Sequence, residues 1–123
     1  DTGKLLRRDV RAQTVCVGSL SQDVGVAGWY PEDDSDSIHS GEDLQAVECA
    51  CRELRAAYDA RIKAVRKKLD LTQEEAGRIL GGGRRAFQKY ERGTMQPSEA
   101  AVGLIEILDR HPEEVTTLRN IRR

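Results

Sequence analysis

Residues 71–93 read LTQEEAGRILGGGRRAFQKYERG, and this stretch decides the fold of the C-terminal half of the chain. Thr72 and Glu75 have the T-x-x-E spacing of a capping box, which is typical of a helix N-terminus. The three glycines at 81–83 end that helix, and a second short helix is expected over about residues 84–92. Two short helices joined by a glycine turn are the layout of a helix-turn-helix, whose second helix enters the major groove of DNA.

The sequence on both sides of this stretch predicts three more helices. An apolar face at spacings of three to four indicates one helix before residue 70, and Pro97-Ser98 and Pro112 each open another. The apolar residues expected to face inward in the five helices are Ile62, Val65 and Leu69; Ala76, Ile79 and Leu80; Phe87 and Tyr90; Val102, Ile105 and Leu108; and the apolar positions after Pro112. We therefore expect a five-helix bundle over residues 59–123.

The second short helix carries the side chains that we expect to contact DNA. Arginine and lysine can donate to guanine O6 and N7, and glutamine can pair with adenine N6 and N7. The residues expected to read bases are Arg84, Arg85, Gln88 and Lys89. Those expected to contact backbone phosphates are Lys67, Lys68, Thr72, Gln73 and Arg92. A basic helix face that is merely solvated is the alternative.

The N-terminal half has a different composition. Short valine-rich runs broken by Gly18-Ser19 predict an antiparallel hairpin with strands at about 5–17 and 20–30. Residues 31–41 have loop composition, and a connecting helix is expected over about 42–57. The fold class is thus mainly α, with a small β-region and a connecting helix over residues 1–58 ahead of the helical domain.

The net charge of -1 conceals an asymmetry between the halves. Residues 1–60 contain 6 Lys+Arg and 12 Asp+Glu, which gives this half a net charge of -6. Residues 61–123 contain 14 Lys+Arg and 9 Asp+Glu, which gives a net charge of +5. A basic half suits a polyanion such as DNA, and an acidic half suits another partner, for which a basic protein is the candidate. Uneven solvation charge without a partner is the alternative.

Length and hydropathy exclude several classes of protein. A chain of 123 residues is too short for an α/β barrel or a doubly wound enzyme. No run approaches the roughly 18 apolar residues of a membrane span, and the N-terminus lacks a signal-peptide profile, so we expect a cytoplasmic protein without a membrane partner. Because the first residue is Asp1, the chain is expected to be a fragment or a processed form.

The sequence predicts neither a cofactor nor a structural metal. Cys16, Cys49 and Cys51 form no C-x-x-C pair, so buried or semi-buried thiols are expected, with metal binding by the last two as the alternative. A loop and turn rich in acids could hold a cation, but its spacing fails the EF-hand pattern. The residues of that candidate site are Asp33, Asp34, Asp36, His39, Glu42 and Asp43.

No constellation for catalysis is present in the sequence. The triple glycine lacks the strand and the G-K-[ST] ending of a phosphate-binding loop. His39 and His111 stand in no recognisable catalytic order, and His111 is expected at a helix end. We therefore expect no enzymatic activity and no small-molecule substrate.

Residues 65–115 resemble the helix-turn-helix domain of the MqsA/YgiT-type antitoxins of bacterial toxin–antitoxin systems, a branch of the Xre/Cro-like superfamily. The run LTQEEAG, the triple glycine, the AFxxYE core and the closing LDxHPE carry the resemblance. DTGKLLRR and GWYPEDDSDSIHSGED resemble the front module of one antitoxin subgroup. The resemblance implies a sequence-specific DNA-binding antitoxin that represses its own operon and neutralises a co-encoded toxin.

The same resemblance implies a homodimer on a palindromic operator, with Arg85 and Lys89 at the two base-reading positions. We place the dimer contact in the last two helices, around Leu104, Leu108, Val115 and Leu118. Many members hold zinc through two C-x-x-C pairs in the front module, and this chain lacks them. Two alternatives remain: a free-standing Xre-family regulator, or a protein-interaction module with vestigial DNA binding.

Overall fold

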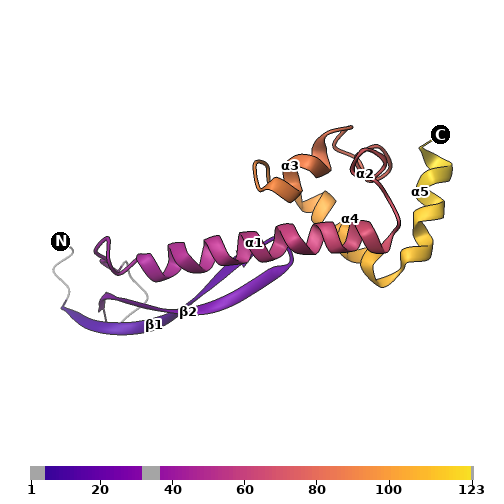
Figure 1. Ribbon diagram of the computed structural model, residues 1–123. Coiled ribbons are helices and arrows are strands. Elements are labelled where there is room, and N and C mark those ends of the chain that lie inside the picture. The colour runs from indigo at the N-terminus through magenta and orange to yellow at the C-terminus, as the bar shows by residue number, and fades with distance from the viewer. Residues whose placement is uncertain (1–4, 32–36, 123) are drawn as a thin grey trace. The chain divides into compact units, whose positions relative to one another are not determined.

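The computed structural model describes residues 5–31 and 37–122 (Figure 1). The chain forms two compact units: Asp1–Val17 with Ser21–Leu54, and Gly18–Leu20 with Arg55–Arg123. The mainly α fold with one small sheet is confirmed. Within the described ranges, no helix has the length and apolar character needed to cross a membrane.

The first unit contains a β-hairpin. Strands β1 (Leu6–Val17) and β2 (Leu20–Pro31) form a two-stranded sheet, and their two-residue connection requires an antiparallel pair. Gly18 in this connection has a φ of +57°, which a glycine adopts without steric cost. Valine side chains at alternate positions of the strands are buried, among them Val15, Val17 and Val26. The hairpin predicted from the sequence is confirmed.

A buried carboxylate fixes the chain after the hairpin. Asp43 is 6% exposed, and both of its oxygens accept hydrogen bonds from the Arg8 guanidinium, one of them at 2.8 Å. Its Oδ2 also accepts from the Ser40 amide at 2.8 Å, and the Asp43 amide donates to Ser40 Oγ at 3.2 Å. The Arg8 hydrogen bonds, followed by the Ser40 amide, hold the pKa of Asp43 far below its usual range.

The connecting helix differs from the prediction at both ends. Helix α1 runs from Gln45 to Lys68, so the expected helix at 42–57 and the first helix of the C-terminal bundle are one continuous element. The expected start is wrong because Ser40 and Asp43 bond each other in a turn that precedes the helix. The domain boundary predicted between residues 58 and 59 lies inside α1, whereas the boundary between the two compact units within α1 lies between residues 54 and 55.

The second unit is a small bundle with the helices α2 (Gln73–Leu80), α3 (Ala86–Arg92), α4 (Glu99–Arg110), η1 (Pro112–Glu114) and α5 (Val115–Ile121). The predicted capping box at α2 is confirmed: the Glu75 amide donates to Thr72 Oγ1 at 3.1 Å, and the Thr72 amide donates to Glu75 Oε1 at 3.2 Å. The core of the bundle consists of buried apolar side chains: Tyr58, Ile62, Val65, Leu69, Leu71, Ala76, Ile79, Leu80, Ala86, Phe87, Tyr90, Ile105, Leu108 and Val115.

Helices α2 and α3 meet across the glycine turn more closely than side chains allow. A Cβ added at Gly77 would lie 2.0 Å from the carbonyl oxygen of Gly83. Gly81, Gly82 and Gly83 have φ values of +109°, +92° and +96°, a region that other residues rarely adopt. The turn therefore needs glycine at 81–83 for its backbone shape and at 77 for the close approach.

We predict that Gly77→Ala destabilises the second unit by about 1–3 kcal/mol or more, because the new methyl group overlaps backbone. Gly103→Ala, in the exposed face of α4, is the matched control: its Cβ meets nothing within 4 Å. That change should stabilise by about 0.5–1 kcal/mol, since alanine favours helix over glycine. Urea unfolding followed by circular dichroism measures both, and equal effects would contradict the account of the turn.

We also predict that the first unit loses stability in acid through Asp43. Because the folded-state pKa of Asp43 lies below that of the unfolded chain, its contribution is complete at neutral pH and declines below about pH 4. Trp29, the single tryptophan of the sequence, lies in this unit and reports its unfolding by fluorescence. The urea midpoint should fall more steeply from pH 7 to pH 3 for the wild type than for Asp43→Asn. Glu42→Gln, at a neighbouring exposed carboxyl, should follow the wild type; parallel curves for all three would count against the assignment.

Candidate nucleic-acid interface

Helix α3 has one buried and one exposed side. Ala86, Phe87 and Tyr90 are buried, and the two aromatic rings meet edge to face with centroids 5.4 Å apart. The four residues predicted to read bases lie on the remaining surface: Arg84, Arg85 and Lys89 are exposed, and Gln88 is half-buried. The helix thus presents donors and an amide on a side that packing leaves open.

A nearly buried ion pair fixes α3 against α1. Arg66 donates to both carboxylate oxygens of Glu91, at 2.8 and 3.0 Å, and the two side chains are 11% and 6% exposed. The same guanidinium donates to the Leu71 carbonyl oxygen at 2.9 Å. A bidentate pair that also satisfies a backbone carbonyl defines both distance and orientation, so it sets the angle at which α3 presents its exposed side.

Sequence reasoning missed this pair. Glu91 is an isolated acid within the otherwise basic stretch 84–92, and that contrast is the signal that could have indicated a buried partner. The pair also changes the role of Gln73, which is half-buried and donates from Nε2 to Glu91 Oε1 at 3.2 Å. The Gln73 side chain therefore ties α2 to α3.

The other predicted phosphate contacts fall into two groups. Lys67 and Arg92 are exposed. Lys68 donates from Nζ to the Asp109 carbonyl oxygen at 2.6 Å and to its carboxylate at 3.1 Å, and the Thr72 oxygen caps α2. Lys67 and Arg92 are thus the members of this set whose charge is open to an external anion.

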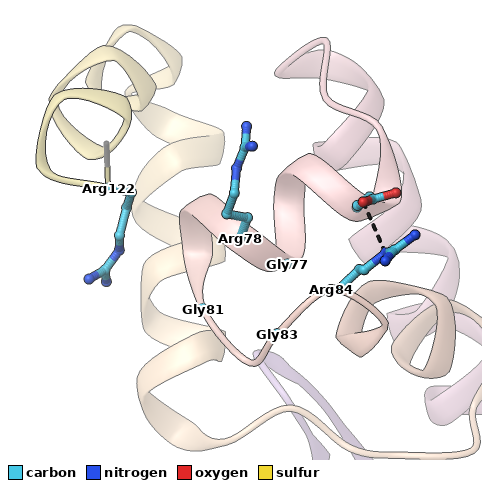
Figure 2. A pocket seen from close by; sticks show the side chains of 7 residues that line it. Gly77, Arg78, Gly81, Gly83, Arg84 and Arg122 are labelled. Carbon is cyan, nitrogen blue, oxygen red and sulfur yellow. Dashed lines mark ion pairs between the residues drawn. The ribbon is translucent and has the colours of Figure 1, made fainter.

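A hollow of about 250 Å³ separates the start of α2 from the start of α3. Its lining residues are Gln73, Glu74, Arg84, Arg85 and Gln88. Arg84 donates into an ion pair with Glu74, with Nε 3.0 Å from Oε1, and this pair appears as the dashed line in Figure 2. Both side chains are largely exposed, so the pair is weak and can open toward a competing anion.

Two further ion pairs hold α4 against α1. Arg61 donates to both oxygens of Glu106, at 2.8 and 2.6 Å, and to Asp109 at 3.1 Å. The Arg61 hydrogen bonds lower the pKa of Glu106, and the Lys68 ammonium lowers the pKa of Asp109. These contacts orient the remaining faces of α4.

The residues predicted to form a dimer contact do not share one environment. Leu108 and Val115 are buried in the core of the unit, because they face inward from α4 and from the start of α5, and they offer no surface to a second copy. Leu104 and Leu118 are half-buried. The large apolar side chains that α4 and α5 expose are Ile107 and Ile121, and neither is among the predicted dimer residues.

The cysteines and acids that the structure describes do not assemble a metal site. Within the two described ranges, no three His, Cys, Asp or Glu side chains gather as ligands would. Cys51 is half-buried, as expected, whereas Cys16 and Cys49 are exposed, so the expectation of buried or semi-buried thiols is wrong for these two. The donor set does not fit the zinc that many members of the resembled family hold.

The candidate cation site contains residues with other partners. His39 places Nδ1 at 2.9 Å from the Ala27 carbonyl oxygen and Nε2 at 2.9 Å from Ser37 Oγ. Asp43 binds Arg8, and Glu42 is exposed. The remaining members of that set, Asp33, Asp34 and Asp36, lie outside the described residues. His111 stands at the end of α4, as predicted.

Comparison with known proteins agrees with the resemblance seen in the sequence. Residues 18–119 match the family model described as the antitoxin component of bacterial toxin–antitoxin system, MqsA. The chain is also 39% identical over 101 residues to the antitoxin MqsA of Escherichia coli (strain K12), an alignment that covers 77% of each protein. The family match covers β2 and the helical part of the chain. This chain therefore belongs to the MqsA family of antitoxin components of bacterial toxin–antitoxin systems.

Proposed function

We propose that this protein is a DNA-binding antitoxin that acts in the cytoplasm, represses its own operon as a homodimer and neutralises a co-encoded toxin. The observation that carries the DNA-binding part is the pairing of α2 and α3 across the glycine turn. This pairing leaves Lys89 exposed on a helix whose other side is packed, with Arg84 and Arg85 exposed at the start of that helix. It has the layout of a helix-turn-helix of the Xre/Cro type with α3 as the recognition helix.

The proposed recognition mode needs no chemistry. Arg85 stands at the N-cap of α3, where its side chain makes no capping hydrogen bond, and Lys89 follows one turn later. Two donors one turn apart on the exposed side can reach neighbouring bases in the major groove. Exposed Lys67 and Arg92 are suited to backbone phosphates, which position the helix without reading sequence.

Dimerisation follows from the small number of base contacts on one helix, since a two-fold pair on a palindrome doubles them. Exposed apolar side chains on α4 and α5 support a contact there. Ile107 lies one turn from half-buried Leu104, and Ile121 lies one turn from half-buried Leu118. We assign the dimer contact to these four residues, with Leu108 and Val115 supporting them from the core.

The first unit supplies the surface proposed for the toxin. Trp29 is 46% exposed and Ile38 is 55% exposed, and their backbones pair through hydrogen bonds of 2.8 and 2.9 Å. An exposed tryptophan beside an exposed isoleucine suits a protein partner. Because residues 1–60 have a net charge of -6, we expect that partner to be basic.

The first test replaces one side chain at a time. On operator DNA, Arg85→Ala or Lys89→Ala should lose about 1–3 kcal/mol of specific binding and relax base preference, while random DNA is affected less. Lys67→Ala should weaken binding to all sequences alike and reduce the salt slope by about 0.9 per lost contact, and so by about 1.8 per dimer. Fluorescence anisotropy on cognate and random duplexes measures both effects. Arg110→Ala, an exposed arginine on α4, is the control, and equal losses on both duplexes for all variants would refute the division of roles.

The second test concerns the toxin surface. The protein should co-purify with the product of the neighbouring gene, and Trp29→Ala should weaken that complex at least about tenfold, because large aromatic side chains dominate binding energy. Met95→Ala, at an exposed apolar residue of the helical unit, is the control and should leave toxin binding unchanged. Absence of a complex at micromolar concentrations would instead favour a free-standing regulator.

A further inference from the structure

Three hollows on the helical unit share rim residues and so form one continuous surface. The first is the hollow between the starts of α2 and α3, and the second, of about 520 Å³, is lined by Glu74, Gly77, Arg78, Gly81, Gly83, Arg84 and Arg122. The third, of about 300 Å³, is lined by Arg78, Ile79, Arg119 and Arg122. Arg84 belongs to the first and second hollows, and Arg78 and Arg122 to the second and third. The surface therefore continues from α3 past the glycine turn to α5.

The far part of this surface, the hollow lined by Arg78, Ile79, Arg119 and Arg122, has three arginines and no acid among its lining residues. Glu74 is paired with Arg84. Glu75 is engaged mainly in the cap of α2, whose hydrogen bonds with Thr72 lower its pKa, and Arg119 and Arg78 contribute to that lowering to a smaller extent. Among residues 5–31 and 37–122, no hydrogen bond or ion pair engages the Arg78 side chain. Such arginines favour an external anion.

The arrangement of these side chains suits an extended polyanion. Figure 2 shows the Arg78 and Arg122 side chains leaving the rim in different directions, with Arg84 on another side of the hollow. Arg122 donates from Nε to the Ile79 carbonyl oxygen at 3.3 Å, which holds it beside the end of α2. Guanidinium groups that do not converge cannot surround one compact ion, but they can each meet one charge of a polymer.

The glycine turn leaves room for that polymer. Gly81 and Gly83 have nothing within 4 Å of where a Cβ would stand, so the surface is open beside these two residues of the turn. Double-stranded DNA carries one negative charge per about 1.7 Å of its axis, which supplies separated charges along such a surface. Continuity with the hollow beside Arg85 and Gln88 aligns this surface with the proposed base-reading helix.

We propose that Arg78, Arg119 and Arg122 bind backbone phosphates of DNA that flanks the bases read by α3. The inference rests on the proposed function, because it requires that α3 read an operator. It extends the DNA footprint beyond the contacts that the sequence predicted, and it gives the arginines at the end of α5 a role in affinity without a role in base choice.

The test compares two duplexes from the DNA upstream of the gene. The short duplex contains only the palindrome that the protein recognises. The long duplex adds about 10 base pairs, or one helical turn, on each side of that palindrome. Arg78→Gln and Arg119→Gln should each reduce the salt slope on the long duplex by about 0.9 per lost contact, and so by about 1.8 per dimer. On the short duplex both should match the wild type. Arg110→Gln removes the same charge from a part of α4 outside the three hollows, and it should match the wild type on both.

The outcomes separate the two proposals. If the wild type does not prefer the upstream DNA to a scrambled duplex, the proposed function fails and the flanking contact fails with it. If the wild type is specific but both variants behave as Arg110→Gln on the long duplex, only the flanking contact is overturned. Saturable binding of inorganic phosphate in calorimetry, lost in Arg78→Gln, would likewise overturn it in favour of a compact anion site.

Discussion

The carbonyl oxygen of Gly83 occupies the space that a side chain at position 77 would need, and the rest of the helical unit depends on this close approach. It brings α2 and α3 together with three successive residues at positive φ between them. Only glycine adopts such a run without strain. The close placement of α3 beside α2 is consequently set by backbone geometry, and the exposed side chains of α3 need not contribute to the packing.

Two ionic contacts convert that local geometry into a fixed surface. Arg66 spans from α1 to Glu91 on α3 and to the carbonyl oxygen of Leu71, while Arg61 spans from α1 to Glu106 on α4. Because Arg66 and Arg61 are engaged in these internal ion pairs, their positive charges are not available to contact DNA. Charge counting along the sequence therefore overstates the number of free cations, and the residues open to an anion are those left after these internal pairs are formed.

Much of the fold could be predicted because its signals are local. The capping box at Thr72, the cap at Ser98 and the triple glycine each act within a few residues, and the structure has them as expected. The junction at residues 42–60 could not be predicted, because apolar spacing continues through it and no residue there breaks a helix. The pairing of Arg66 with Glu91 spans 25 positions, a separation at which charge pattern alone does not identify partners.

The most direct measurement of the central claim, that α3 is a sequence-reading helix, is fluorescence anisotropy of the unmodified protein on the DNA upstream of its own gene and on a scrambled duplex, across a salt series. The account predicts a preference for the upstream duplex of roughly 10³ or more that persists as salt rises. Equal binding to both duplexes with a steep dependence on salt would contradict it, because that result would reduce the basic half to non-specific attraction for phosphate.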